Sequence, residues 1–183
     1  MFTVLVAAVV AAAAPAGVPL SVDPATSVAT YHVRHALHAV DGRSSAIEGK
    51  AIVGDDGRVM AMVRIPISSF DSGDANRDAN MRDTLEISKF PYVVFKAVAH
   101  LPVPAPHGHA FETTLDGELD FHGVRHRLAV PATVTLGDDG GAAVKARLHV
   151  SLDAFHVERP SLLFVKLQDD CSVDVDLKLR SSP

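Results

Sequence analysis

The feature that most constrains the fold is an alternation of apolar and polar residues that recurs along most of the chain. Residues 171–180 show it clearly: Cys171, Val173, Val175, Leu177 and Leu179 alternate with Ser172, Asp174, Asp176, Lys178 and Arg180. Successive side chains of a β-strand point to opposite faces, so this pattern predicts a strand with one dry and one wet face. Residues 111–121, 124–134 and 142–152 follow the same rule.

Turn residues separate these runs. Asp and Gly tolerate positive φ angles, so residues 55–57 and 138–141 predict hairpin turns, and the His-Gly pair at 122–123 predicts a tight turn. We expect about eight strands joined mostly as an antiparallel meander, which closes or nearly closes into a lipocalin-like β-barrel. A two-sheet sandwich is the alternative. The strands are expected near residues 27–38, 44–53, 59–67, 92–101, 110–121, 124–135, 142–152 and 171–180.

Two connections are too long to be tight turns. In the connection at 68–91, residues 77–87 suit a short helix, with Asp74 or Asn76 as its N-cap. The second connection, at 153–170, is expected to be a helical or loop segment. Structured connections of this length over a barrel mouth are usually lids or plugs.

The beginning of the sequence resembles a targeting segment. No charged side chain precedes Asp23, residues 4–14 are small and aliphatic, and Ala14-Pro15-Ala16 provides a cleavage site. We therefore expect residues 1–16 to be a signal peptide and residues 17–183 to be one mature domain in the periplasm or secreted. An uncleaved membrane anchor is the alternative, but prolines and a glycine interrupt the apolar stretch, which disfavours a span.

Composition narrows the function classes. The chain has 183 residues, 48% of them hydrophobic, which is enough for one domain with a sizeable core. Its formal net charge of −5 argues against a nucleic-acid partner, which requires a basic surface. The single cysteine excludes an intramolecular disulfide and a multi-cysteine metal site.

The histidines and acidic residues do not form a recognisable reaction centre. His32 and His38 would share a strand face but lie about 20 Å apart, and His35 would point to the opposite face. The chain contains no G-x-S-x-G elbow and no glycine-rich phosphate loop. Cys171 alternates inward, which favours a buried, inert thiol. We therefore expect no catalytic residues, no metal and no cofactor.

The stretch at 70–81, followed by Lys-Phe-Pro-Tyr-Val-Val-Phe at 89–95, resembles the YceI-like family. The strand–Gly–strand segment at 117–126, the opening at 27–35 and Gly49 carry the same resemblance. It covers about residues 20–181, and its most specific part is the Arg77-Asp78 pair with the Phe-Pro at 90–91. The resemblance implies a periplasmic or secreted lipocalin-like barrel that holds a long apolar ligand such as a polyisoprenoid.

The alternation independently identifies side chains that would face a barrel interior. A barrel of about eight strands is either filled by its side chains or able to hold one small ligand. Small inward residues such as Ala97 and Gly117 would leave room between larger ones. The predicted ligand-binding residues are Val63, Ile65, Phe95, Ala97, Phe111, Leu115, Gly117, Leu119, Phe121, Leu148, Val173 and Val175.

The first hypothesis is therefore a binding protein whose partner is a long-chain apolar molecule, of isoprenoid or fatty-acyl type, which it does not transform. The alternative is an extracytoplasmic stress-response or interaction module whose barrel is fully packed. An enzyme ranks last. The mature domain is not expected to span a membrane, and the sequence leaves the oligomeric state open, a homodimer included.

Overall fold

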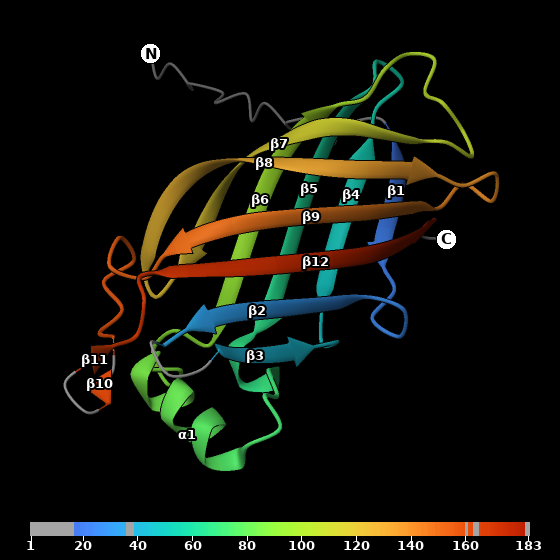
Figure 1. Ribbon diagram of the computed structural model, residues 1–183. Coiled ribbons are helices and arrows are strands. Elements are labelled where there is room, and N and C mark those ends of the chain that lie inside the picture. The colour runs from blue at the N-terminus through green and yellow to red at the C-terminus, as the bar shows by residue number, and fades with distance from the viewer. Residues whose placement is uncertain (1–16, 36–38, 160, 163–164, 182–183) are drawn as a thin grey trace, which may run out of the picture.

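The computed structural model describes residues 17–35, 39–159, 161–162 and 165–181, so the predicted signal peptide at 1–16 lies outside the described residues. The described chain folds into an antiparallel barrel with a short helix at one end (Figure 1). The strands that form the closed ring are β1 (Val18–Val22), β4 (Glu48–Val53), β5 (Arg58–Pro66), β6 (Tyr92–His100), β7 (Ala110–Phe121), β8 (Val124–Leu136), β9 (Ala142–Ser151) and β12 (Asp170–Ser181).

The barrel closes between the first and last of these strands. β1 pairs with β4 on one side and with β12 on the other, where Leu20 lies opposite Ser181 and Val22 opposite Leu179. The remaining neighbours along the ring are all antiparallel. The predicted closed antiparallel barrel of about eight strands is thus confirmed, and the sandwich alternative is wrong.

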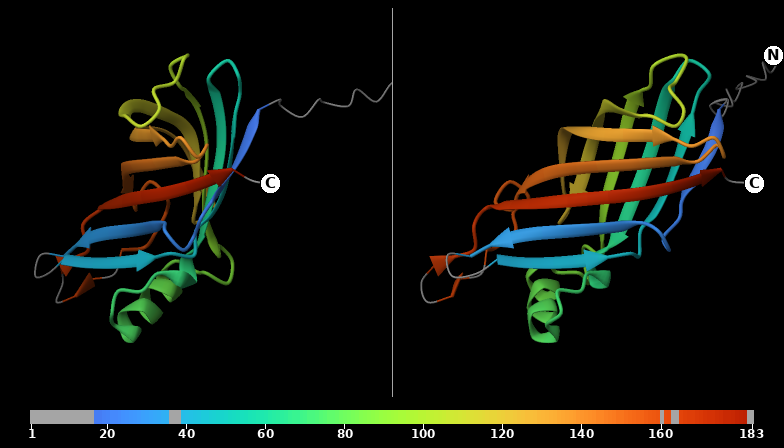
Figure 2. Two further views of the ribbon diagram at one scale, coloured as in Figure 1. Left: turned by 90° about the vertical axis from the view of Figure 1, so that its right-hand side faces the viewer. Right: turned by 45° about the vertical axis from the view of Figure 1, so that its right-hand side comes forward.

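A β-hairpin of β2 (Val28–Arg34) and β3 (Ala39–Ser44) extends the barrel wall outside the ring; we call it the flap. β12 pairs with β2 through residues 171–176 and with β1 through residues 179–181, so one edge of β12 serves two partners. Figure 2 shows the flap continuing the sheet of β9 and β12. The expectation that the strand near 27–38 belongs to the ring was wrong: β1 takes that place, β2 ends at Arg34, and residues 36–38 lie outside the described residues.

The first long connection holds a 3₁₀ turn, η1 (Ile67–Ser69), and the helix α1 (Ala75–Thr84). The Asp74 carboxylate accepts hydrogen bonds from the backbone N–H groups of Asn76 and Arg77, so Asp74 is the N-cap. The helix therefore begins and ends earlier than the predicted 77–87. Arg43 at the end of β3 forms a two-bond bridge with Asp71, which ties the flap to this connection. Together these contacts place α1 below the flap at one end of the barrel (Figure 1).

The second long connection, predicted as a helical or loop segment, contains a turn after Leu152 and two short strands. These strands, β10 (Ser161–Leu162) and β11 (Val165–Lys166), pair with each other. The Asp169 carboxylate fastens the base of this segment to the end of β9 by accepting hydrogen bonds from the Ser151 hydroxyl at 2.6 Å and the Asp153 N–H at 2.7 Å. No helix among the described residues is long and apolar enough to cross a membrane.

The inward faces of the strands form the walls of the barrel. One cluster of buried side chains, including Leu20, Ile47 and Phe70, packs where β1, β4 and β12 meet. A second, including Ile67, Phe121 and Phe155, packs beneath the loop after β9. Apolar side chains thus coat the wall from inside, while the polar positions of the same strands face out.

Candidate functional site

The barrel encloses a cavity of about 930 Å³. Inward-facing residues from all eight ring strands line it, and most are aliphatic; examples are Leu20, Ala51, Ala61, Val130 and Ala146. Ligand sites are typically mostly apolar cavities of about 300–1,000 Å³ with a few placed polar groups. The interior of this barrel therefore has the size and the lining of a site for an apolar molecule.

The structure brings most of the predicted ligand-binding residues together in this cavity. Phe111 and Gly117 are not among its lining residues, although Phe111 lies opposite the lining residue Val134 in the β7–β8 ladder. The predicted residues that line the cavity are Val63, Ile65, Phe95, Ala97, Leu115, Leu119, Phe121, Leu148, Val173 and Val175.

Gly117 has a different role from the one its small size suggests. A Cβ added there would lie 2.5 Å from the backbone oxygen of Lys96 and 2.6 Å from the ring of Phe95. Both residues belong to β6, where Ala97 lies directly opposite Gly117. The glycine thus lets the Phe95 ring lie flat against the β7 backbone. The space above Gly117 is filled by that ring rather than left to a ligand.

The flap repeats this arrangement. Tyr31 on β2 lies opposite Gly42 on β3, and a Cβ on Gly42 would lie 2.3 Å from the Tyr31 ring. The other side of the ring meets Phe70 in an edge contact with centroids 5.4 Å apart. Tyr31 lines the cavity together with Val33, His35 and Val40 of the flap. These flap residues were not among the predicted ligand-binding residues, because only the observed topology shows that the flap extends the cavity wall.

The α1 end of the cavity is polar. The helix and its cap contribute lining residues that alternation of strands could not reveal: Asp74, Asn76, Arg77, Asn80, Asp83 and Thr84. This rim contrasts with the aliphatic walls. A molecule that occupies the cavity would therefore meet hydrogen-bonding groups at this end.

Arg77 and Asp78, the most specific part of the family resemblance, hold the loop that leads into α1. The Arg77 guanidinium donates from Nε to the Ser72 hydroxyl at 2.9 Å and from Nη2 to the Ser72 carbonyl at 2.6 Å. The buried Asp78 carboxylate accepts from the Ser72 hydroxyl at 2.5 Å and from its N–H at 3.1 Å. Both residues of the pair thus form hydrogen bonds with Ser72, which fix the position of α1 over the barrel.

Two histidines of the β7–β8 hairpin hold the loop after β9. His122, at φ 50°, and Gly123, at φ 75°, form the predicted tight turn. His122 donates from Nδ1 to the Phe155 carbonyl at 3.1 Å, and His126 donates from Nε2 to the Ala154 carbonyl at 3.0 Å. Leu152 and Val157 of this loop line the cavity, so the two histidines stabilise part of its wall.

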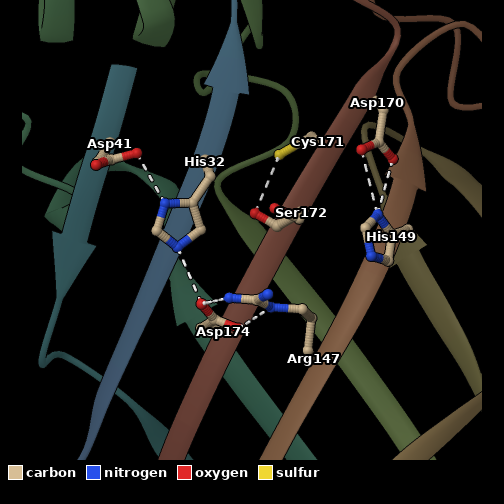
Figure 3. Close-up of polar contacts among 8 residues, drawn as sticks. All are labelled: His32, Asp41, Arg147, His149, Asp170, Cys171, Ser172 and Asp174. Atoms are coloured by element: carbon tan, nitrogen blue, oxygen red, sulfur yellow. Dashed lines mark hydrogen bonds and ion pairs between the residues drawn. The ribbon is translucent and has the colours of Figure 1, made fainter. Parts of the chain in front are cut away.

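The outer face of the flap, β12 and β9 carries a row of charged pairs (Figure 3). His32 lies between two carboxylates, with Nδ1 2.7 Å from Asp41 and Nε2 3.1 Å from Asp174. Arg147 donates from Nε to Asp174 Oδ1 and from Nη2 to Oδ2, the same oxygen that faces His32, and lowers the pKa of that carboxyl. Exposed ion pairs of this kind typically contribute about 0–1 kcal/mol each to the stability of the fold. The row joins strands on the solvated face and lies outside the cavity.

Two titratable groups of the cavity wall, Cys171 and Tyr31, are held in their neutral forms by burial. Burial raises the pKa of Cys171 to about 12, and burial followed by the charge of Asp78 raises the pKa of Tyr31 to about 12. A thiol with such a pKa lacks the thiolate that nucleophilic catalysis requires. Across the described part of the chain, no three His, Cys, Asp or Glu side chains gather in a group that could hold a metal ion.

Comparison with known proteins agrees with this architecture. A polyisoprenoid binding domain from Saccharophagus degradans, implicated in plant cell wall breakdown, superposes with a TM-score of 0.74 at 17% identity, covering 90% of this chain and 99% of that one. Burkholderia cenocepacia BcnA gives 0.72 at 19% identity, covering 86% and 98%. A Campylobacter jejuni YCEI protein gives 0.62 at 15% identity, covering 79% and 86%.

These three structures share the fold at low sequence identity. No curated protein matches the sequence. The sequence model of one family, the YceI-like domain, matches residues 20–179, which include the ring from Leu20 to Leu179, the flap and α1. Because that match spans nearly all of the described barrel, the chain belongs to the YceI-like domain family.

Proposed function

We propose that this protein binds one long apolar molecule, a polyisoprenoid or a similar lipid, inside its barrel and does not transform it. The observation that carries the proposal is the cavity of about 930 Å³ with aliphatic lining from every ring strand. A fully packed barrel, as the alternative of an interaction module requires, would leave no such volume. The description of the Saccharophagus degradans relative as a polyisoprenoid binding domain supports the ligand class.

The energetics of transfer from water are sufficient for such a ligand. Each buried CH₂ group contributes about 0.8 kcal/mol, so a chain of about twenty carbons gains about 16 kcal/mol in gross terms. Association costs about 4–15 kcal/mol in lost freedom of motion. A ligand of this length therefore keeps a favourable net free energy without a strong polar contact, provided that most of its surface is covered.

The chemistry of the interior supports binding without reaction. A candidate nucleophile, Cys171, is kept as a thiol by burial. The buried Asp78 accepts its hydrogen bonds from Ser72 and so serves the loop structure. Neither group is arranged as an activated nucleophile or as an acid–base pair.

We further infer that the protein acts outside the cytoplasm after removal of residues 1–16. The uncharged apolar run ending at Ala14-Pro15-Ala16 supports export. N-terminal sequencing of the exported protein tests this: a start near Gly17 is expected, and a cytoplasmic product that retains Met1 would contradict it. The family membership is compatible with either outcome.

The binding proposal is tested by native mass spectrometry of the purified protein, followed by organic extraction and analysis of the extract. We expect a bound species whose mass is lost on extraction and recovered as an apolar molecule. The apo protein should then take up an added long-chain isoprenoid at one molecule per chain. If no apolar molecule co-purifies and none binds, the interaction-module alternative replaces this proposal.

A further inference from the structure

The flap forms the cavity wall along the part of β12 that β1 does not reach. β1 pairs with β12 through residues 179–181, whereas residues 171–176 of β12 pair with β2. Tyr31, Val33 and Val40 of the flap line the cavity. Because β1 and β12 close the ring without β2 or β3, the pairing of the flap with β12 can break while the ring stays closed. Its separation would uncover the cavity beside residues 171–176.

One side chain on the outer face joins both strands of the flap to β12. His32 on β2 lies between Asp41 on β3 and Asp174 on β12, with Nδ1 2.7 Å from Asp41 and Nε2 3.1 Å from Asp174 (Figure 3). Both are hydrogen-bond distances. An ionised carboxylate only accepts, so both bonds exist only when both ring nitrogens carry a proton and the ring is cationic. A neutral ring has one N–H, and its other nitrogen would direct a lone pair at a carboxylate.

We propose that protonation of His32 holds the flap against β12, and that the flap opens more readily when the ring loses one proton. Histidine typically changes its charge between about pH 5 and 8. The flap is therefore held at mildly acidic pH and opens more often at mildly alkaline pH. A second part rests on the proposed function: the same change sets how readily the apolar molecule enters and leaves the cavity past β2.

The charged groups around His32 lie on three strands. Asp41 and Asp174 contact the ring directly, and a positive charge on the ring would be attracted by both. Three arginines on the same outer face oppose a further positive charge. Arg147 of β9 donates both of its hydrogen bonds to Asp174, and the other two lie one outward position along from His32 and Asp41, which is about 6.6 Å of strand. These two are Arg34 and Arg43.

The other contacts that hold the flap are backbone hydrogen bonds, which do not titrate. They include the ladder with β12, the two bonds between Arg43 and Asp71, and the Gln168 N–H that donates to the Arg34 carbonyl at 2.8 Å. The flap has one more titratable ring, His35, which is buried and lines the cavity. A test of His32 must therefore leave His35 unchanged.

The test is hydrogen–deuterium exchange with mass spectrometry on the apo protein at about pH 5.5 and about pH 8.5. Protection is calculated against unstructured peptides at the same pH, which cancels the chemical effect of pH on exchange. The variants are Asp41→Asn and His32→Gln. In Asp41→Asn the new amide can donate to a bare ring nitrogen, so the neutral ring keeps both contacts. The matched control is His149→Gln, because His149 makes the same kind of pair with Asp170 but joins β9 to β12.

We expect peptides from β2 and β3 of the wild type to lose protection by up to about 5-fold between the lower and the higher pH, the equivalent of one exposed ion pair, while β7 and β8 keep theirs. The difference should vanish in Asp41→Asn and in His32→Gln and persist in His149→Gln. Equal protection of the wild-type flap at both pH values, or an unchanged difference in Asp41→Asn, would overturn the inference.

Release of a fluorescent isoprenoid probe tests the second part. The wild type should release the probe faster at the higher pH, and Asp41→Asn should release it at the same rate at both. A wild-type release rate that does not change with pH would overturn passage past the flap. Failure of the probe to bind would instead overturn the proposed function, and the exchange data, taken without ligand, would still decide the role of His32.

Discussion

Replacing Ala97 with phenylalanine fills the cavity from one wall. Ala97 lies in the middle of β6, lines the cavity and is 8% exposed. Its neighbours across the sheet are Ala61 on β5 and Gly117 on β7, so the row is made of small residues. The Phe95 ring fills the space above Gly117, but Ala97 itself lines the cavity, so a ring at this position can extend into the open interior.

The expected effects on stability and on binding are very different. Burying a phenylalanine side chain contributes about 1.5–3 kcal/mol, and forcing it into a wall that must adjust costs about 1–3 kcal/mol, so the free energy of unfolding should change by less than about 2 kcal/mol. An aromatic side chain covers at least about 150 Å². If it covers wall that the ligand would otherwise contact, the loss at about 25 cal/mol per Å² is up to about 3.8 kcal/mol, or several-hundred-fold in affinity.

The assay is titration of the apo protein with a fluorescent isoprenoid probe, accompanied by urea unfolding of each variant. Val98→Phe is the matched control, because Val98 is the next residue of the same strand and its side chain lies on the outer face opposite Met60. Ala97→Phe should abolish most binding and Val98→Phe should leave it near the wild-type value. If Ala97→Phe binds the probe as the wild type does, the cavity is not where the ligand lies.

Three further predictions follow from single residues. Burial raises the pKa of Cys171 from 9.0 to about 12, so its thiolate fraction near neutral pH falls about a thousandfold. Iodoacetamide should therefore label Cys171 only in urea, and rapid labelling of the native protein would contradict that burial. Gly117→Ala should lower the melting temperature, because the new Cβ would contact the Phe95 ring and the backbone oxygen of Lys96. Adding Phe95→Leu should recover only part of that loss, since the Lys96 oxygen remains. An unchanged melting temperature in the single variant would refute the close approach. Hydrogen bonds from Ser151 and from backbone N–H groups lower the pKa of Asp169 in the folded protein. Its contribution to the free energy of unfolding is therefore present above the unfolded pKa of about 3.9 and is lost as the pH falls through the folded pKa. On acidification from pH 5, Asp169→Asn should lose less stability than the wild type, and equal losses would exclude this contribution.

Long strands were predictable because each contains many alternations. The run expected at 171–180 is β12 at Asp170–Ser181, and the run expected at 110–121 coincides with β7. β1 has five residues and β3 six, with a proline in one and a glycine in the other, so neither gives a strong local pattern. The pairing of β1 depends on partners distant in the sequence, residues 50–53 of β4 and 179–181 of β12, whereas β3 pairs with the neighbouring β2.

The same division holds for the cavity. Residues such as Val63 and Leu148 were identified because strand parity alone decides that they face inward. Tyr31 shares that parity, but its role depends on the flap joining β12, a contact between residues more than a hundred positions apart. Gly117 was predicted to leave room for a ligand because it is small, whereas the ring of Phe95 on the next strand occupies that space. Local periodicity thus predicts which face of a strand a side chain occupies, and the tertiary topology decides what that side chain contacts.

The seam between β1 and β12 also governs when the barrel can form during folding. The pairs Leu20–Ser181 and Val22–Leu179 join nearly the whole length of the sequence, and β2 depends on the same last strand. Contacts of this separation form late and make folding slow. Until β12 arrives, the other strands are an open sheet with unpaired edges and an exposed apolar face, which favours aggregation. A chain that ends before Asp170 should therefore be insoluble, and the protein acquires its cavity and its solubility in one late step.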